Sequence, residues 1–298
     1  MDIRFIGGPA LSCVAAGAIQ AHCGRMLWEV EPRLAFNRAV DPYDAIRPSY
    51  PAALFDALFE MLPPRPDIVE VGPGTGQATR DLLGRGASIH AVEIGPEMAV
   101  RLRTNLRTHQ LHITVGDFEE QLIDPASVDV VFSATAYHWI SPAAQLNRPA
   151  QVLRPGGLIA IVDLVQVSSP EDVGFFDAAQ PIYQRYGQGH AGPPTPRRDQ
   201  VDPAIRAALT ADDRFADILV RQYDWDQTYS AMDYRTLMLS YSVTQMMDRA
   251  DRERLLDDIQ GLIGDHFGGC VTRPLVATLT TARLTAESQC RSACNNAD

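Results

Sequence analysis

Residues 69–79 read Val69-Glu-Val-Gly-Pro-Gly-Thr-Gly-Gln-Ala-Thr79, and this stretch decides the fold. An apolar run comes before the glycines and a helix-forming run follows them, which is the order of a strand, a tight turn and a helix. Gly72, Gly74 and Gly76 remove the Cβ atoms from one face of the turn. A flat polar ligand can therefore lie against the backbone and face the N-terminus of the following helix. The stretch predicts a ligand-binding turn at the edge of a parallel sheet.

Apolar runs and helical patterns alternate on both sides of this turn, which indicates βαβ units. The predicted strands are Asp67–Val71, Ser88–Glu93, His112–Val115, Val128–Ser133 and Leu158–Val162. The predicted helices are Tyr50–Leu62, Gln77–Leu83, Pro96–Arg107 and Pro142–Leu153. Gly156 and Gly157 are expected to form a turn before the fifth strand. The pattern predicts an α/β, doubly wound, mostly parallel Rossmann-like sheet.

The pattern becomes irregular after Val165, where Pro, Gly, Gln and aromatic residues accumulate. We predict an inserted cap there. Amphipathic stretches at Met232–Tyr241 and Arg252–Ile263 precede a last strand at Leu275–Leu284. The predicted ranges are an N-terminal extension at 1–40, a ligand-binding core at 41–167, a cap or substrate insertion with the sixth-strand segment at 168–245, a completion of the core at 246–285 and a flexible tail at 286–298.

Composition excludes several classes of function. The chain has 298 residues and a formal net charge of -11, so its surface repels phosphate polyanions and nucleic acid is not an expected partner. The cysteines have neither CxxC nor zinc-ligand spacing, so we expect no metal and a reduced, cytoplasmic setting. No apolar run reaches the roughly 18 to 20 residues of a membrane span, so no stable membrane insertion is expected. The first two dozen residues fit an extension better than a signal peptide.

Three acidic positions indicate which class of ligand the turn binds. Glu93 ends the second predicted strand, where a carboxylate can accept hydrogen bonds from both hydroxyls of a ribose. Glu70 lies inside the first strand, and its burial fits a nearby cationic amino-acid group better than a pyrophosphate. Asp117 and Phe118 follow the third strand and offer a carboxylate and a ring to an adenine. The set favours a nucleoside that carries a cationic amino acid.

These motifs together resemble the class I S-adenosylmethionine-dependent methyltransferases, and more narrowly the small-molecule branch of trans-aconitate-type methyltransferases. The resemblance rests on Tyr43-Asp-Ala-Ile-Arg-Pro-Ser-Tyr-Pro51, Glu70-Val-Gly-Pro-Gly-Thr-Gly76, Ala91-Val-Glu-Ile94, Gly116-Asp-Phe118, Ala136-Tyr-His-Trp139 and Val152-Leu-Arg-Pro-Gly-Gly-Leu158. It implies a seven-stranded sheet whose last strand, Leu275–Leu284, is antiparallel, and S-adenosyl-L-methionine as the cofactor.

The resemblance also implies roles for individual residues. The expected cofactor contacts are Glu70, Gly72, Gly74, Gly76, Glu93, Ile94, Asp117, Phe118 and Ala134. The expected lid and substrate contacts are Tyr43, Arg47, Tyr50 and Trp139. Arg47 has an alternative interpretation as a surface residue that holds the N-terminal turn by a salt bridge, because a guanidinium reaches either place.

His138 and Tyr137 are the candidate catalytic residues. His138 is either a general base near the methyl group or a core imidazole with both nitrogens satisfied. Aromatic residues of the insertion either line an acceptor pocket or, as we favour, pack the insertion; they are Tyr183, Tyr186, Tyr223, Trp225, Tyr229 and Tyr241.

The predicted activity is methyl transfer from S-adenosylmethionine to a small-molecule acceptor, at an oxygen of a carboxylate or hydroxyl. On the strength of the resemblance the carboxylate is preferred. An NAD(P)-dependent reductase is the first alternative, but the chain lacks a recognisable Ser/Tyr/Lys catalytic grouping, and Gln77 stands where the dinucleotide fingerprint has a small residue. A non-catalytic protein that binds S-adenosylmethionine is the second alternative.

Overall fold

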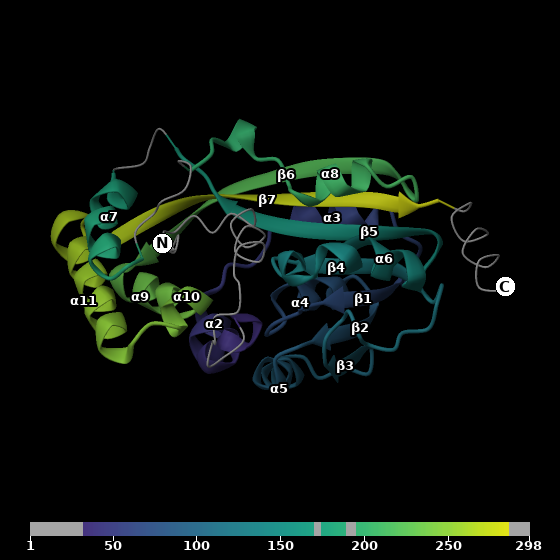
Figure 1. Cartoon of the computed structure of the whole chain (residues 1–298), viewed down its shortest axis with the longest axis horizontal. Coiled ribbons are helices and arrows are strands. Elements are labelled where there is room, and N and C mark those ends of the chain that lie inside the picture. Colours follow the sequence, from purple (N-terminus) through teal and green to yellow (C-terminus); the bar gives the residue numbers. More distant parts are fainter. Residues whose placement is uncertain (1–31, 170–173, 189–194, 286–298) are drawn as a thin grey trace. The chain divides into compact units, whose positions relative to one another are not determined.

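The computed structural model describes residues 32–169, 174–188 and 195–285 (Figure 1). Most of the predicted N-terminal extension and the whole predicted tail lie outside the described residues. The chain divides into two compact units, each built from several segments. Unit 1 holds the described residues up to Pro48, with Leu164–Val201 and Asp224–Val276. Unit 2 holds Ser49–Asp163, Asp202–Tyr223 and the residues from Ala277 on.

The described residues form a seven-stranded sheet with the order β3-β2-β1-β4-β5-β7-β6. Its strands are β1 (Asp67–Val71), β2 (Ser88–Glu93), β3 (Leu111–Val115), β4 (Val128–Ala134), β5 (Leu153–Gln166), β6 (Phe215–Ser230) and β7 (Cys270–Leu284). β1 pairs in parallel with β2 and β4, β2 with β3, and β4 with β5. The predicted doubly wound, mostly parallel sheet is confirmed. The strand order reverses beside β1, where ligands of such sheets bind at the carboxyl edge.

β7 runs antiparallel to both of its neighbours, as expected. The Thr285 N–H donates to the Arg214 carbonyl at one end of the β6/β7 pair, and the Ala231 N–H donates to the Gly269 carbonyl at the other. Because one residue number rises while its partner's falls, these two strands are antiparallel. Hydrogen bonds from Val167 to Pro274 and from Arg283 to Gly156 give the same relation between β5 and β7.

Unit 2 has its core around β1 and β4. Val69, Val131 and Ile159 come from neighbouring strands of the sheet and are fully buried. The helices of this unit are α3 (Ala52–Phe59), α4 (Gln77–Gly84), α5 (Pro96–Asn105), the 3-10 turn η2 (Tyr137–Trp139), α6 (Pro142–Val152) and α8 (Ile205–Thr210). A proline opens α5 and α6, because the first turn of a helix needs no internal N–H bond.

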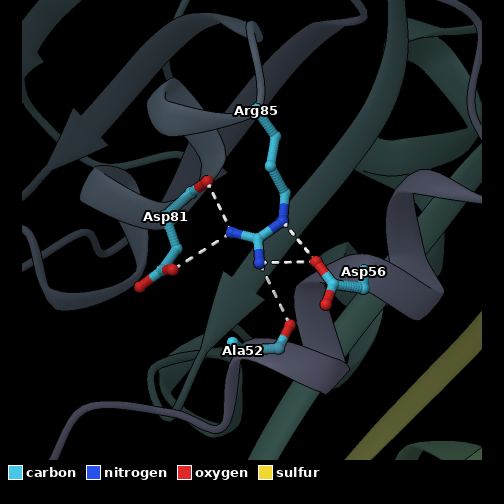
Figure 2. A network of polar contacts seen from close by, with 4 residues as sticks. All are labelled: Ala52, Asp56, Asp81 and Arg85. Carbon is cyan, nitrogen blue, oxygen red and sulfur yellow. Dashed lines mark hydrogen bonds and ion pairs between the residues drawn. The ribbon is translucent and has the colours of Figure 1, made fainter.

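Arg85 ties α4 to α3 at the periphery of unit 2 (Figure 2). Its Nε and Nη2 donate to Asp56 Oδ1 at 3.0 and 2.6 Å, and its Nη1 donates to Asp81 Oδ1 at 3.1 Å. The Ala52 carbonyl accepts a further bond from Nη2 at 3.1 Å. This fork joins the segment before β1 to the helix that follows the glycine turn, so it supports the turn from outside the ligand-facing edge.

Unit 1 is mainly helical. Its elements besides strand ends are η1 (Pro32–Ala39), α2 (Val40–Ile46), α7 (Phe175–Arg185), η3 (Arg198–Gln200), α9 (Ala231–Leu239), α10 (Ser242–Gln245) and α11 (Arg249–His266). The side chain of Ser230 caps α9 and that of Asp248 caps α11. Phe175, Tyr234 and Leu256 lie in a buried apolar core between these helices. Tyr183 and Tyr229 are buried in the same core, so the packing interpretation is confirmed for them.

The predicted turn at Gly156 and Gly157 is instead part of β5. Leu153 pairs with Val128 and Leu158 pairs with Val130, so the β5 side carries extra residues in a bulge. Gly156 has φ +78°, and a Cβ on Gly157 would lie 2.8 Å from the Arg154 carbonyl oxygen. The prediction of a turn before the fifth strand is therefore wrong, because β5 begins at Leu153 and includes both glycines.

Candidate active site

The glycine turn between β1 and α4 has the backbone that only glycine adopts readily. Gly72, Gly74 and Gly76 have φ of +65°, +59° and +102°. A Cβ added to Gly72 would lie 2.5 Å from Ala136 Cβ, and one added to Gly76 would lie 2.7 Å from Leu102 Cδ1. The turn thus passes close to the segment after β4 and to α5, and side chains at these glycines have no room.

The side chains of Asn105 and Gln77 hold the turn in place. The Asn105 side-chain amide, at the end of α5, donates to the Thr75 carbonyl at 2.9 Å. Gln77 Nε2 donates to Thr75 Oγ1 at 2.7 Å. Gln77 is the residue that breaks the dinucleotide fingerprint, and this bond gives it a role in the turn. No local pattern identifies Asn105, because its contact lies 30 residues away.

Glu93, at the end of β2, joins the glycine turn to the next loop. Its Oε2 accepts from the Gly74 N–H at 3.0 Å and its Oε1 accepts from the Gly95 N–H at 2.8 Å. Burial raises the pKa of Glu93, and these two backbone hydrogen bonds partly offset that rise. Ile94 is half-buried between Glu93 and Gly95. The carboxylate that was predicted to meet a ribose therefore lies against the glycine turn.

Glu70 is fully enclosed in β1 and is only 1% exposed. Its Oε2 has no hydrogen-bond partner among the described residues. Burial raises the pKa of Glu70 to about 8, the Thr79 hydroxyl lowers it in part, and Glu93 raises it further. A buried carboxyl group with an unpaired oxygen is costly, so it marks a place where a polar or cationic group would be stabilised.

The two residues after β3 differ in their placement. Asp117 Oδ1 accepts from the Glu119 N–H at 3.0 Å, which fixes the loop. The Phe118 side chain is 2% exposed in the core of unit 2, and the Arg148 guanidinium carbon lies 5.7 Å from its ring centroid. The ring is therefore buried in this core, and its contact with an adenine stays a prediction.

The segment after β4 carries the predicted catalytic residues. Ala134, half-buried, ends the strand, and Thr135 follows with φ +56°. Thr135 Oγ1 and the Tyr50 hydroxyl form a hydrogen bond of 3.1 Å. Tyr50, from the segment before α3, thus lies beside the end of β4, where a substrate contact was predicted.

Tyr137 and His138 have different environments within η2. The Tyr137 ring is 3% exposed in the core, its hydroxyl donates to the Gln145 carbonyl at 2.5 Å, and burial raises its pKa. The hydrogen bond fixes η2 on α6, and a catalytic role for Tyr137 stays a prediction. His138 is partly exposed, its Nδ1 has no described partner, and burial lowers its pKa to about 4. Its ring centroid lies 5.0 Å from that of the partly exposed Trp139.

Tyr43 and Arg47 belong to unit 1. The Arg47 guanidinium carbon lies 4.6 Å from the centroid of Tyr43 and 4.9 Å from that of Tyr241. Arg47 Nη2 donates to the Ser240 carbonyl at 2.9 Å. Within the described residues Arg47 forms no ion pair, so the salt-bridge alternative finds no partner there. The lid interpretation of Tyr43 and Arg47 stays a prediction.

Sheet order, glycine turn and a carboxylate at the end of β2 define an α/β protein that binds a nucleoside cofactor at its carboxyl edge. Comparison with known proteins identifies the family to which the chain belongs. Residues 69–161 match the family described as a methyltransferase domain. An uncharacterised methyltransferase of Mycobacterium tuberculosis is 32% identical over 78% of this chain and 87% of its own. The chain belongs to the class I S-adenosylmethionine-dependent methyltransferases.

One further relative and two solved structures are similar to this chain. A malonyl-[acyl-carrier protein] O-methyltransferase of Serratia marcescens is 33% identical over 46% of this chain and 54% of its own length. A solved type II methyltransferase structure from Anaeromyxobacter dehalogenans superposes with a TM-score of 0.55 and 26% identity, covering 81% of this chain and 98% of its own. A fold neighbour from Haemonchus contortus, at 15% identity and TM-score 0.50 over 86% of this chain and 60% of its own, holds S-adenosylhomocysteine.

The protein is therefore a methyltransferase enzyme that uses S-adenosyl-L-methionine. This finding favours the predicted activity over an NAD(P)-dependent reductase. The narrower resemblance to trans-aconitate-type enzymes stays a prediction. Among the described residues, no three His, Cys, Asp or Glu side chains gather into a possible metal site. None of the helices in those ranges has the length and apolar character to cross a membrane.

Proposed function

We propose that this methyltransferase transfers the methyl group to an oxygen of a small carboxylic acid and releases a methyl ester. The cofactor class and the enzyme class follow from the family. The acceptor and the residues that bind the cofactor are our proposals, and the contacts within unit 2 support them.

The cofactor fits the residues at the carboxyl edge of β1 and β2. The glycines at 72, 74 and 76 leave the turn without side chains, and Glu93 is held beside it by two backbone N–H groups. Each oxygen of Glu93 uses one lone pair in these bonds and keeps another for a ribose hydroxyl. The unpaired oxygen of Glu70 suits a cationic amino-acid group. Asp117, Phe118, Ile94 and Ala134 complete the proposed set.

S-adenosylmethionine, when bound, supplies a methyl group on a positively charged sulfur, which needs no metal or covalent enzyme residue. The protein's part is to align the acceptor and to exclude water from it. Holding two reactants in line can contribute roughly 7–11 kcal/mol to lowering the barrier. Tyr50, fixed on Thr135, and the partly exposed Trp139 are the side chains that we propose border the acceptor on the β4 side.

The environment of His138 favours a carboxylate over a hydroxyl as the methyl acceptor. A hydroxyl acceptor must lose its proton during transfer, and a general base works best when its pKa is near the working pH. Burial lowers the pKa of His138 to about 4, so its imidazole is neutral at pH 7 and binds a proton weakly. A carboxylate is already deprotonated at that pH and needs no base.

The curated relatives support an oxygen acceptor. The Serratia marcescens protein is named an O-methyltransferase, and two further relatives from Dechloromonas aromatica and a Marinomonas species share that name. Each matches just over half of the relative's own length. These names support oxygen as the atom that accepts the methyl group and do not identify the acid.

Incubation with S-adenosylmethionine labelled in its methyl group and with fractionated metabolite extract tests the proposal. We expect label in small acidic compounds, and we expect mild alkali to release it as methanol because a methyl ester hydrolyses there. The Glu93→Ala variant is the matched control and should transfer no label. Label that survives alkali in an ether or an amine would contradict the carboxylate acceptor.

A further inference from the structure

The loop after β3, residues 116–121, is tied to α6 by the side chain of Glu119. Its Oε1 accepts from the Ser141 N–H at 2.8 Å, and its Oε2 accepts from the Ser141 hydroxyl at 2.6 Å. Both carboxylate oxygens therefore bond to one residue that lies 22 positions along the chain. Ser141 is the N-cap of α6, directly after η2 and Ile140. Glu119 and Ser141 both belong to unit 2, so this contact lies within one compact unit.

The hydroxyl of Ser141 does not make the bond that an N-cap serine usually makes. A capping hydroxyl accepts a hydrogen bond from a backbone N–H in the first turn of its helix. Among the described residues the Ser141 side chain makes no such bond, and it donates to Glu119 instead. The carboxylate thus lies at the N-terminus of an 11-residue helix, where the helix dipole stabilises it. The Glu119–Ser141 contact therefore links two segments and does not cap the helix in the usual way.

The backbone of Glu119 holds Asp117 at the other end of this link. The Glu119 N–H donates to Asp117 Oδ1 at 3.0 Å. The N–H groups of Gln121 and Glu120 donate to the Asp117 carbonyl at 2.9 and 3.1 Å. The Asp117 carboxylate is therefore oriented by the same residue whose side chain is bound to α6. Loss of the Glu119 carboxylate bonds would loosen the Asp117 side chain as well.

Arg148 holds the path of the same loop independently of Glu119. Its Nη2 donates to the Gln121 carbonyl at 2.5 Å, and its Nε donates to the Phe118 carbonyl at 3.3 Å. Its Nη1 donates to Gln151 Oε1 at 2.7 Å, so the guanidinium is itself held by α6. These bonds reach backbone carbonyls of the loop. The loop should therefore stay on α6 when the bonds of Glu119 are removed, and only the orientation of Asp117 should be lost.

We propose that Glu119 is a positioning residue that sets the base specificity of the cofactor site by orienting Asp117 toward the amino group of adenine. This inference rests on the proposed function, which includes Asp117 among the cofactor contacts. An amino group donates hydrogen bonds and a carboxylate only accepts them, so the two groups are complementary. A base with a carbonyl oxygen in place of the amino group presents an acceptor to the carboxylate, and the two acceptors repel each other.

Calorimetric binding of S-adenosylhomocysteine and of its deaminated analogue, S-inosylhomocysteine, to the full chain tests this role. The analogue carries an oxygen in place of the amino group. We expect the wild type to bind the adenosyl compound about 10- to 150-fold more tightly, the range of one hydrogen bond to a charged group. In Glu119→Gln the amide NH₂ faces a Ser141 donor, so the link is broken. The ratio of the two affinities should then fall to about threefold or less.

Two further variants make the test specific. Glu120→Gln is the matched control, because it removes the same charge from the neighbouring, exposed side chain, and its ratio should equal that of the wild type. Ser141→Ala removes the hydroxyl and leaves the Ser141 backbone N–H for Glu119, so its ratio should fall part of the way. Urea unfolding shows whether each variant is folded, and Ser141→Ala decides the question if Glu119→Gln is not.

A purely structural role of Glu119 would weaken both ligands by the same factor and leave their ratio at the wild-type value. That result in Glu119→Gln would overturn the proposal and leave the adenine contact of Asp117 intact. An equal fall of the ratio in Glu120→Gln would also overturn it, because the lost charge alone would then explain the effect. A wild type that does not distinguish the two ligands would contradict the adenine contact of Asp117, and with it the proposal.

Discussion

Replacing Gly72 by alanine should both destabilise the chain and damage the cofactor site. Gly72 has φ +65°, and its added Cβ would lie 2.5 Å from Ala136 Cβ. The left-handed backbone costs a non-glycine residue about 1–2 kcal/mol. The overlap with Ala136 adds about 1–3 kcal/mol, because two methyl groups cannot approach so closely and the segment after β4 must shift. The expected loss is therefore about 2–5 kcal/mol.

Urea unfolding followed by circular dichroism measures this loss, and calorimetry measures binding of S-adenosylmethionine. Ala136→Gly provides the matched second variant. This substitution removes the methyl group that would clash with the new Cβ at position 72. In the double variant Gly72→Ala/Ala136→Gly the overlap is therefore absent. The remaining costs are the left-handed backbone at position 72 and the added chain flexibility of glycine at position 136. The coupling between the two sites should be about 1–3 kcal/mol in the direction of rescue. A Gly72→Ala variant within about 0.5 kcal/mol of the wild type, or a double variant without rescue, would refute the close approach.

Three further predictions concern the carboxyl edge of the sheet. Glu93→Ala should abolish detectable S-adenosylmethionine binding in calorimetry, because it removes the acceptor of the Gly74 and Gly95 N–H groups as well as the proposed ribose contact; retained affinity would exclude that contact. The pKa of Glu70 is raised to about 8 from an ordinary 4.5, so the folded state holds this proton more tightly than the unfolded state does. The free energy of unfolding should therefore be highest below pH 4.5 and decline toward pH 8, by at most about 5 kcal/mol. Glu70→Gln should flatten this decline in urea titrations, and an unaltered pH profile in that variant would contradict the burial argument. His138→Ala should change turnover of a carboxylate acceptor by less than about threefold; a large loss that high pH restores would instead indicate a hydroxyl acceptor.

The sequence predicts the strands and the glycine turn well because both depend on local pattern. Alternation of apolar runs and helices fixed the parallel order from β1 to β5, and the glycines at 72, 74 and 76 marked a turn whose backbone requires them. Glu93 could be placed because the ends of neighbouring parallel strands meet at one edge.

The sequence does not predict the direction of a loop side chain or the contacts between residues that are far apart in the chain. The rings of Phe118 and Tyr137 are buried in the core of unit 2, and the sequence pattern does not show which way a loop residue turns. Asn105 and Thr75 meet across 30 residues, and Arg47 and Arg273 both contact Tyr241 from distant segments of unit 1. Such contacts depend on the completed fold, so no local pattern contains them.

A crystal structure of the protein soaked with S-adenosylhomocysteine tests the central claim most directly. We expect the adenosyl group at the carboxyl ends of β1 and β2, with the ribose hydroxyls on Glu93 and the amino group near Glu70. Density for the nucleoside elsewhere, or a ribose that leaves Glu93 uncontacted, would contradict it.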